Sequence, residues 1–338
     1  MSSRGAQLSI FGRLPDGREV HSIELKVEGL RARLITLGAA LQALYVEPDA
    51  HSVVLGYPSL EGYLENPAHL GAVVGRFANR IGGARFSLDG ETYQLDANQA
   101  GRHTLHGGHD GLTRQLWRLD EHGPDYALMS ARLPDGHMGF PGALEVEARY
   151  QLSAQRLELK LSARAEALTV CNLTTHAYFN LSGSGTIADH LLCVQAEELL
   201  ELDAEQLPTG RRLSLDGSPL DLRQPRLLSE RGAPLSLDHH YCLQEAPGPL
   251  KSVATLSHQG LTMTLSATAP GLQIYTGAGL DGASVADARL LPYAGVALEP
   301  QLWPDAPNQP HFYPARLAPG ERYESLITFG FERGVASS

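Results

Sequence analysis

Alternating apolar and polar positions dominate this chain. From Leu144 to Leu152 every second residue is apolar, and after a short polar turn the same period resumes from Leu157 to Leu161. A period of two residues is that of a strand with one buried face, so this stretch predicts a β-hairpin. The same alternation recurs from Leu261 to Ala267, and the carboxy-terminal segment RYESLITFGFE is also typical of a strand.

Turn signals separate these stretches at short intervals. Among them are Pro15-Asp16-Gly17 and Asp89-Gly90, and the 35 Gly and 21 Pro are spread evenly. Helical periodicity is scarce, and Ser59 to Leu64 predicts at most a short turn of helix. No composition break or internal repeat divides the chain. We therefore predict a single domain over residues 1–338, all-β, built as a large antiparallel β-sandwich.

Composition and net charge limit the kinds of molecule that this protein is expected to bind. The 338 residues carry 27 Lys and Arg against 38 Asp and Glu, a net charge of −11. Phosphate recognition needs clustered cations, so neither nucleic acid nor an anionic membrane is expected as a partner. No stretch approaches the roughly 20 apolar residues of a membrane span. A neutral small molecule is the better expectation for the ligand.

The cysteines and the amino terminus suggest a cytoplasmic location. Cys171, Cys193 and Cys242 are few and far apart, and no CxxC pair favours a disulfide framework or a zinc knuckle. The segment MSSRGAQLSIFGRLPDG lacks the apolar core of a signal peptide.

Two polar clusters stand out in the first third of the chain. In GRFANRI, Arg76, Asn79 and Arg80 lie in an otherwise apolar run, where a cation needs a partner such as a carboxylate or a sugar hydroxyl, although a solvated face is the alternative. In His103-Thr104-Leu105-His106-Gly107-Gly108-His109 the spacing invites a metal, but too few further ligands are near. The two glycines suggest instead that the backbone approaches a ligand, with His106 presented to it.

A third cluster, Thr174 to Leu181, places His176, Tyr178 and Asn180 on one face of a strand. A lone histidine is commonly a core residue, but three polar side chains on one face resemble a binding surface: imidazole for proton transfer, an aromatic for a sugar ring, an amide for hydroxyls.

Two carboxylates complete the candidate chemistry. Asp238 precedes two histidines, a weak signal that a surface turn also explains. Glu299 ends an apolar strand before the proline-rich WPDAPNQP, a suitable place for a buried general base, or for an ordinary strand-end carboxylate.

Taken in order, these segments resemble the aldose 1-epimerase family. GRFANRI, NQAGRHTLHGG, THAYFNLSG, LPTG, LDHHY, PGLQIYTG, LEPQ and WPDAPNQP follow the family's sequence of motifs over most of the chain. The resemblance implies the family's fold, a galactose mutarotase-like supersandwich, which agrees with the alternation. It also implies interconversion of the α and β anomers of free aldohexoses such as D-galactose and D-glucose, with no cofactor and no metal.

The resemblance further implies roles for single residues. Glu299 would take the proton of the C1 hydroxyl, His176 would protonate the ring oxygen, and His106 would hydrogen-bond near both. The residues implied to hold the sugar are Asn79, Arg80, Tyr178, Asp238 and Gln273. We expect burial to raise the pKa of Glu299 and a carboxylate such as Asp238 to keep His176 protonated.

Some positions depart from the family pattern, and two other functions remain open at this point. Pro300 follows the base where a small polar residue is usual, and Arg102-His103 replaces a proline and a small polar residue. A glycoside hydrolase would need a second carboxylate, for which only Asp238 is available. A non-catalytic carbohydrate-binding protein would need no acid–base pair. A sugar phosphate is disfavoured as substrate because cations are scarce around the motifs. We expect a monomer or a homodimer.

Overall fold

The computed structural model describes residues 7–65, 68–280, 284–285 and 288–334. Its pairings between named strands are all antiparallel, as the alternation predicts. The largest sheet has nine strands, in the order β10 (Arg118–His122), β11 (Tyr126–Leu133), β12 (Leu144–Ser153), β13 (Arg156–Ala165), β31 (Tyr323–Arg333), β25 (Leu261–Ala267), β24 (Lys251–His258), β17 (Leu191–Val194) and β20 (Arg226–Leu227).

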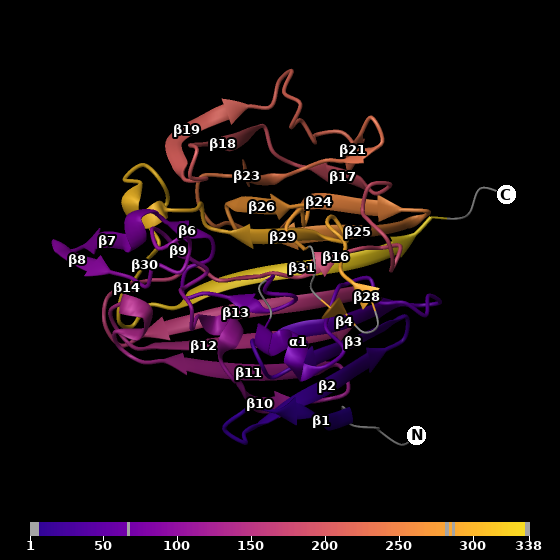
Figure 1. The fold of residues 1–338 in the computed structure, drawn as a ribbon, viewed down its shortest axis with the longest axis horizontal. Coiled ribbons are helices and arrows are strands. Elements are labelled where there is room, and N and C mark those ends of the chain that lie inside the picture. The colour runs from indigo at the N-terminus through magenta and orange to yellow at the C-terminus, as the bar shows by residue number, and fades with distance from the viewer. Residues whose placement is uncertain (1–6, 66–67, 281–283, 286–287, 335–338) are drawn as a thin grey trace.

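Two smaller sheets pack against this one. The four-stranded sheet consists of β1 (Gln7–Arg13), β2 (Glu19–Val27), β3 (Leu30–Ile35) and β4 (Ala40–Val46). The six-stranded sheet has the order β16 (Tyr178–Phe179), β29 (Val296–Gln301), β26 (Gly271–Tyr275), β23 (Asp238–Cys242), β18 (Glu198–Leu202) and β19 (Pro208–Ser214). Figure 1 shows the four-stranded sheet along the lower part of the molecule and the six-stranded sheet along the upper part.

Short two-stranded ladders and single turns of helix connect the sheets. The ladders are β5 (Val73–Val74) with β15 (Thr174–Thr175), β6 (Arg80–Ile81) with β9 (Thr104–Leu105), β7 (Arg85–Leu88) with β8 (Glu91–Gln94), β14 (Thr169–Val170) with β30 (Arg316–Leu317), β21 (Ser229–Glu230) with β22 (Ala233–Pro234), and β27 (Ser284–Val285) with β28 (Ala288–Arg289). The helical turns are α1 (Leu60–Glu65) and the 3₁₀ turns Gly82–Ala84, Leu112–Arg114, His137–Gly139 and Ala306–Asn308. None of the helices in the described ranges has the length and apolarity that crossing a membrane requires.

The expected hairpin and strands are confirmed. β12 and β13 pair in register from Leu144 opposite Ala165 to Ser153 opposite Arg156, and the apolar positions of β12 are the buried ones. β25 shows the same alternation, β31 is the carboxy-terminal strand, and α1 occupies the one predicted helical turn. Local periodicity therefore fixes which face of each strand is buried.

The main core lies between the nine-stranded sheet and the two smaller sheets. It combines apolar side chains of β2 and β3 with those of β12, β13 and β31 and with those of β26 and β29. One contact across the layers joins the rings of Phe179 on β16 and Phe329 on β31, whose centroids are 4.8 Å apart. Removing this much apolar surface from water is the main favourable contribution to folding.

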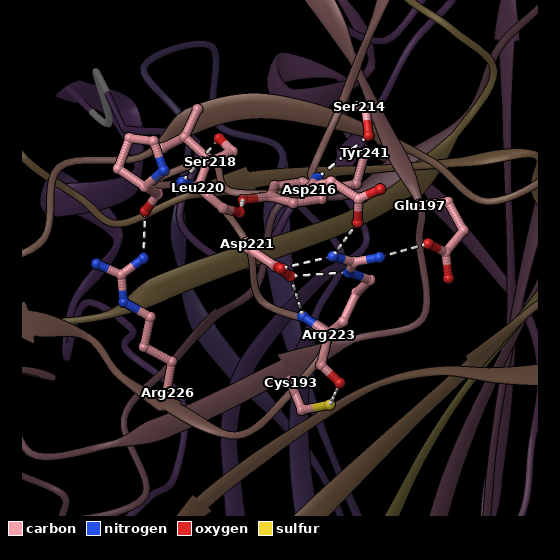
Figure 2. Close-up of polar contacts among 11 residues, drawn as sticks. Cys193, Glu197, Ser214, Asp216, Ser218, Leu220, Asp221, Arg223, Arg226 and Tyr241 are labelled. Atoms are coloured by element: carbon pink, nitrogen blue, oxygen red, sulfur yellow. Dashed lines mark hydrogen bonds and ion pairs between the residues drawn. The ribbon is translucent and has the colours of Figure 1, made fainter.

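The connection between β19 and β20 is held by one arginine. Arg223 forms ion pairs with Glu197, Asp216 and Asp221 (Figure 2). Beside it the Tyr241 hydroxyl of β23 donates to the Leu220 carbonyl at 2.9 Å. These contacts tie the loop to β23, the strand that carries Asp238.

Candidate active site

All eight site residues that the family resemblance implies line one cavity of about 230 Å³ on the six-stranded sheet. They are Asn79, Arg80, His106, His176, Tyr178, Asp238, Gln273 and Glu299. The cavity is smaller than the ~300–1,000 Å³ of sites for drug-sized molecules, which suits a small ligand. The structure therefore brings together side chains that the sequence spreads over more than half of the chain.

Strand register explains why the carboxylates and the amide share the cavity. Gln273 on β26 lies directly opposite Glu299 on β29, and Asp238 on β23 lies opposite Tyr275 on β26. Residues directly opposite in an antiparallel pair project to the same face, and so do residues two apart on one strand. Adjacent strands thus present Asp238, Gln273 and Glu299 side by side.

Glu299 and His176 face each other at the bottom of the cavity. Nε2 of His176 lies 3.6 Å from Oε1 of Glu299, and the two side chains are 6% and 2% exposed. Neither Nδ1 of His176 nor Oε2 of Glu299 has a hydrogen-bond partner within the protein. A buried polar atom without a partner is costly, so each of these atoms has an unused capacity for a hydrogen bond.

Burial moves the pKa values of this pair in opposite directions. It raises the pKa of Glu299 well above its usual range; nearby Asp238 adds to the rise and Arg80 opposes it. Burial lowers the pKa of His176 to about 3, with His69 contributing in the same direction. The expected rise for Glu299 is confirmed. The expectation that a carboxylate keeps His176 protonated is wrong, because desolvation dominates and Asp238 acts on Glu299 instead.

His106 is held by a reciprocal backbone contact. The Asn79 N–H donates to Nδ1 of His106 at 3.2 Å, and the His106 N–H donates to the Asn79 carbonyl at 3.2 Å. Both residues have positive φ, 52° for His106 and 66° for Asn79, a conformation uncommon outside glycine. Burial lowers the pKa of His106 well below its usual value. The ring is therefore neutral, with its proton on Nε2.

The polar groups next to Glu299 form a hydrogen-bonded chain. Nε2 of Gln273 donates to Oδ1 of Asp238 at 2.6 Å, and a guanidinium nitrogen of Arg80 lies 3.7 Å from Oδ2 of Asp238. Nε of Arg80 donates to Gln99, and the Arg80 N–H donates to Oδ1 of Asn79. These bonds fix the donors and acceptors before any ligand arrives.

Sequence reasoning missed several residues of the cavity. His69 lines it, with its ring centroid 5.1 Å from that of His106 and 5.9 Å from that of His176. Tyr275 also lines it, and its hydroxyl accepts the Gly279 N–H at 2.6 Å. Alternation with Gln273 offered a signal for Tyr275, whereas no local pattern distinguished His69.

Two polar side chains assigned to binding by their position are structural. Asn180 lies outside the cavity lining; it donates to the Ala294 and Ser184 carbonyls and accepts from Ser182. Arg76 is 1% exposed and donates to the carbonyls of Pro141 and Gly142 rather than lining the cavity. Backbone carbonyls accept hydrogen bonds from Nδ2 of Asn180 and from Nη1 of Arg76, whereas Nε and Nη2 of Arg76 are buried without a partner.

The expectation for the two glycines after His106 is also corrected. A Cβ on Gly107 would lie 2.1 Å from the Gly75 carbonyl oxygen, and one on Gly108 would meet Asp96 and Met138. Gly107 has φ +86° and Gly108 φ +96°. Glycine is thus required at both positions for two reasons. Other atoms of the protein lie too close for a Cβ, and the backbone has a positive φ that favours glycine.

Among the residues that the structure describes, two groups of side chains have the donor atoms of a metal site. One consists of His106, His176 and Glu299, whose donor atoms lie within 4.8 Å of one another. The other consists of Asp189, His190 and His258. In the second group Nε2 of His190 accepts the Leu181 N–H at 2.9 Å, which leaves the ring proton on Nδ1, beside Asp189. A ring with both nitrogens so engaged is a poor metal ligand.

Fold and cavity together define an antiparallel β-sandwich with a buried carboxyl and imidazole paired in a small polar site. A family model described as aldose 1-epimerase matches residues 21–330. Galactose mutarotases of Bos taurus and Homo sapiens are 39% and 38% identical, each over 96% of this chain and 97% of the relative. The aldose 1-epimerase of Escherichia coli K12 is 32% identical over 94% of this chain and 96% of its own.

Solved structures agree with the sequence relatives. An aldose epimerase homologue from C. elegans has a TM-score of 0.87 at 29% identity, covering 93% of this chain and 99% of its own. Galactose 1-epimerase from Lactobacillus acidophilus NCFM has a TM-score of 0.85 at 25% identity, covering 99% and 100%. The chain belongs to the aldose 1-epimerase family, whose members are enzymes of the isomerase class.

Proposed function

We propose that this enzyme interconverts the α and β anomers of free aldohexoses, D-galactose and D-glucose among them, by acid–base ring opening. The observation that carries the proposal is the buried pair of Glu299 and His176, 3.6 Å apart in a small polar cavity. The relatives named galactose mutarotase support galactose as a substrate.

Ring opening is a balanced double proton transfer. Glu299 as carboxylate takes the proton from the C1 hydroxyl while the His176 imidazolium gives one to the ring oxygen. The bond from C1 to the ring oxygen breaks and a carbonyl forms at C1. Rotation about C1–C2 then presents the other face of the aldehyde, and the reverse transfers close the ring. General acid and base catalysis each contribute typically ~10²–10⁴-fold.

The pair must hold one proton throughout. The proposed ring opening starts from the form of the pair with this proton on His176 and ends with a protonated Glu299 and a neutral His176. Burial favours that second, uncharged form of the pair in the free cavity. The proton count is the same in both, so the two sites titrate as a coupled unit. The shifted pKa values therefore support a proton that is exchanged between the two residues and the sugar.

The remaining side chains would hold the sugar. His106, neutral and with Nε2–H free to donate, would bond to a sugar oxygen near the ring oxygen. Asn79, Arg80, Asp238 and Gln273 would bond to hydroxyls, with Tyr178 forming one wall. The Tyr178 and His176 rings lie 4.9 Å apart, which supports a role in packing the acid.

Polarimetry of freshly dissolved α-D-galactose tests the proposal. The enzyme should accelerate the approach to the equilibrium rotation, whereas a carbohydrate-binding protein would leave the spontaneous rate unchanged. Release of chromophore from a nitrophenyl galactoside would instead indicate a glycoside hydrolase, in which Asp238 would serve as the second carboxylate.

We also propose a cytoplasmic location and one domain over residues 1–338. The three cysteines are free and buried, which fits a reducing compartment. Apolar side chains from β2 through β31 share one core. The assembly as a monomer or homodimer stays a prediction.

A further inference from the structure

A third histidine stands in the cavity without a role in the proton transfers. His69 lines the cavity and packs edge-on against His106, with ring centroids 5.1 Å apart. Its ring is also tilted against that of His176 at 5.9 Å. His106 and His176 are themselves 5.3 Å apart, so the three imidazoles form a triangle.

The backbone fixes His69 beside His176. The turn that starts at His69 closes with the Ala72 N–H donating to the His69 carbonyl at 3.1 Å. The same turn is hydrogen-bonded to both backbone groups of His176. The Gly71 N–H donates to the His176 carbonyl at 3.0 Å, and the His176 N–H donates to the Ala72 carbonyl at 2.9 Å. His69 has φ 55°, a conformation that costs energy for a non-glycine residue and persists where surroundings enforce it. Its position is therefore built into the site.

His69 contacts the two other histidines of the cavity, whereas Glu299 lies 3.6 Å from Nε2 of His176. The donor atoms of His106, His176 and Glu299 all lie within 4.8 Å of one another, and His69 is not a member of that group. His69 lowers the pKa of His106 and of His176, Asp238 and Arg80 act on Glu299, and Arg80 also lowers the pKa of His106. Within the described residues, His69 thus packs against the two histidines, whereas Asp238 contacts Gln273 and Arg80.

The covalent structure of a pyranose indicates which group of the sugar would lie beside His69. The ring oxygen is bonded to C1 and to C5. If Glu299 is at the C1 hydroxyl and His176 at the ring oxygen, the next group beyond His176 is the substituent on C5. This step rests on the proposed function.

We infer that His69 recognises the exocyclic C6 hydroxyl of an aldohexose and is a specificity-determining residue for hexoses over pentoses. A neutral imidazole offers one N–H donor and one acceptor, and a hydroxyl both donates and accepts. Pentoses lack the whole C6 group, whereas 6-deoxyhexoses lack only its hydroxyl. Comparing the two classes of sugar therefore separates the effect of a hydrogen bond to the C6 hydroxyl from that of a packing contact with C6.

Three sugars of one ring configuration test this inference: D-galactose, its 6-deoxy analogue D-fucose, and L-arabinose, which lacks C6. Polarimetry gives kcat/KM for each with the full-length enzyme. Replacing His69 by Phe should lower the preference for D-galactose over D-fucose by roughly 3- to 10-fold, the range of one neutral hydrogen bond. Activity on L-arabinose should change by less than activity on D-galactose.

A second variant of His69 and a control variant of another cavity residue make the test independent of whether the Phe variant folds. His69→Asn places a residue that tolerates positive φ and shortens the side chain, so the same loss of preference is expected even if the Phe variant misfolds. Asp238→Asn changes the carboxylate that contacts Gln273 and Arg80, and it should lower kcat/KM for all three sugars by a similar factor.

The outcomes separate the inference from the proposed function. Unchanged sugar preferences in folded, active His69 variants would overturn the inference and leave the mutarotase proposal intact. A wild-type enzyme that accelerates mutarotation of none of the three sugars would overturn the proposed function itself.

Discussion

Two hydrogen bonds join Asn79 and His106: the Asn79 N–H donates to Nδ1 of the His106 ring, and the His106 N–H donates to the Asn79 carbonyl, each at 3.2 Å. The two residues flank the β6–β9 ladder at the same end: Asn79 precedes Arg80 and His106 follows Leu105, and these two residues pair with each other. Closing the ladder therefore orients the imidazole, and Nε2–H is left to face the cavity.

We predict that Gly107→Ala disrupts this arrangement. The new Cβ would lie 2.1 Å from the Gly75 carbonyl oxygen, so the backbone next to His106 must shift. Gly17→Ala is a matched control, because Gly17 has φ +88° against +86° for Gly107 but has nothing within 4 Å of its Cβ position. Urea denaturation should show Gly107→Ala less stable than Gly17→Ala by about 1–3 kcal/mol. Equal losses would mean that backbone strain alone, and not the close contact, requires the glycine.

Removing either member of the proton-transfer pair should abolish most of the activity. Glu299→Gln and His176→Asn should each lower kcat by at least ~100-fold, with unchanged circular dichroism, because each removes one acid–base group. Near-normal kcat in either variant would refute the assignment.

Glu299→Gln should also stabilise the protein at alkaline pH. The folded-state pKa of Glu299 lies above its unfolded value, so the wild type loses stability as the pH rises from the unfolded pKa through the folded one. Gln does not titrate. Thermal unfolding should therefore show a higher Tm for Glu299→Gln at pH 8, with the difference shrinking near pH 4. A lower Tm at pH 8 would contradict the direction of the shift.

The dependence of the rate on pH should show that Glu299 and His176 together carry one proton in the active enzyme. Activity is expected to fall at high pH, when Glu299 and His176 have lost that proton, and in acid, when they gain a second. Asp238 raises the pKa of Glu299 and Arg80 lowers it. Asp238→Asn should therefore move the alkaline limb to lower pH and Arg80→Gln to higher pH. Shifts in the same direction in both variants would contradict this electrostatic assignment.

The folded protein should be sensitive to acid. Burial lowers the pKa to about 4 for His69 and His190 and to about 3 for His176 and His240. In the unfolded chain these histidines bind protons below about pH 6.5. The contribution of these neutral histidines to the free energy of unfolding is thus complete above pH 6.5. It is lost as the pH falls toward their folded-state pKa values, by about 1.4 kcal/mol per pH unit for each histidine.

Urea denaturation at pH 7 and pH 5 measures this loss. His240→Gln provides the comparison, because His240 is fully buried with neither ring nitrogen hydrogen-bonded and lies outside the cavity lining. The variant should lose less stability between the two pH values than the wild type. Equal losses would show that His240 does not contribute.

Chelation tests the expectation that no metal is needed. The donor atoms of His106, His176 and Glu299 are close enough to hold an ion. Ring opening by proton transfer requires none, so dialysis against EDTA should leave kcat within about twofold, well inside the factor that one acid–base group supplies. A loss that added zinc restores would assign this cluster to a metal.

Much of the architecture was predictable from the sequence, because the strand period is a local property. The β12–β13 hairpin, β25 and β31 were predicted from alternation alone, and their buried faces follow it. The order of the motifs indicated the family, and the eight residues implied by it line one cavity.

Neighbours from distant parts of the chain were decided only by tertiary structure. Asn180 and Arg76 resembled binding residues by pattern, yet both satisfy backbone carbonyls. His69 had no local signal, because its place depends on a turn hydrogen-bonded to His176. The protonation of His176 likewise depends on the surrounding burial. Alternation along a strand reports which face is turned inward, but desolvation and hydrogen-bond partners depend on which other segments fill the space around a side chain.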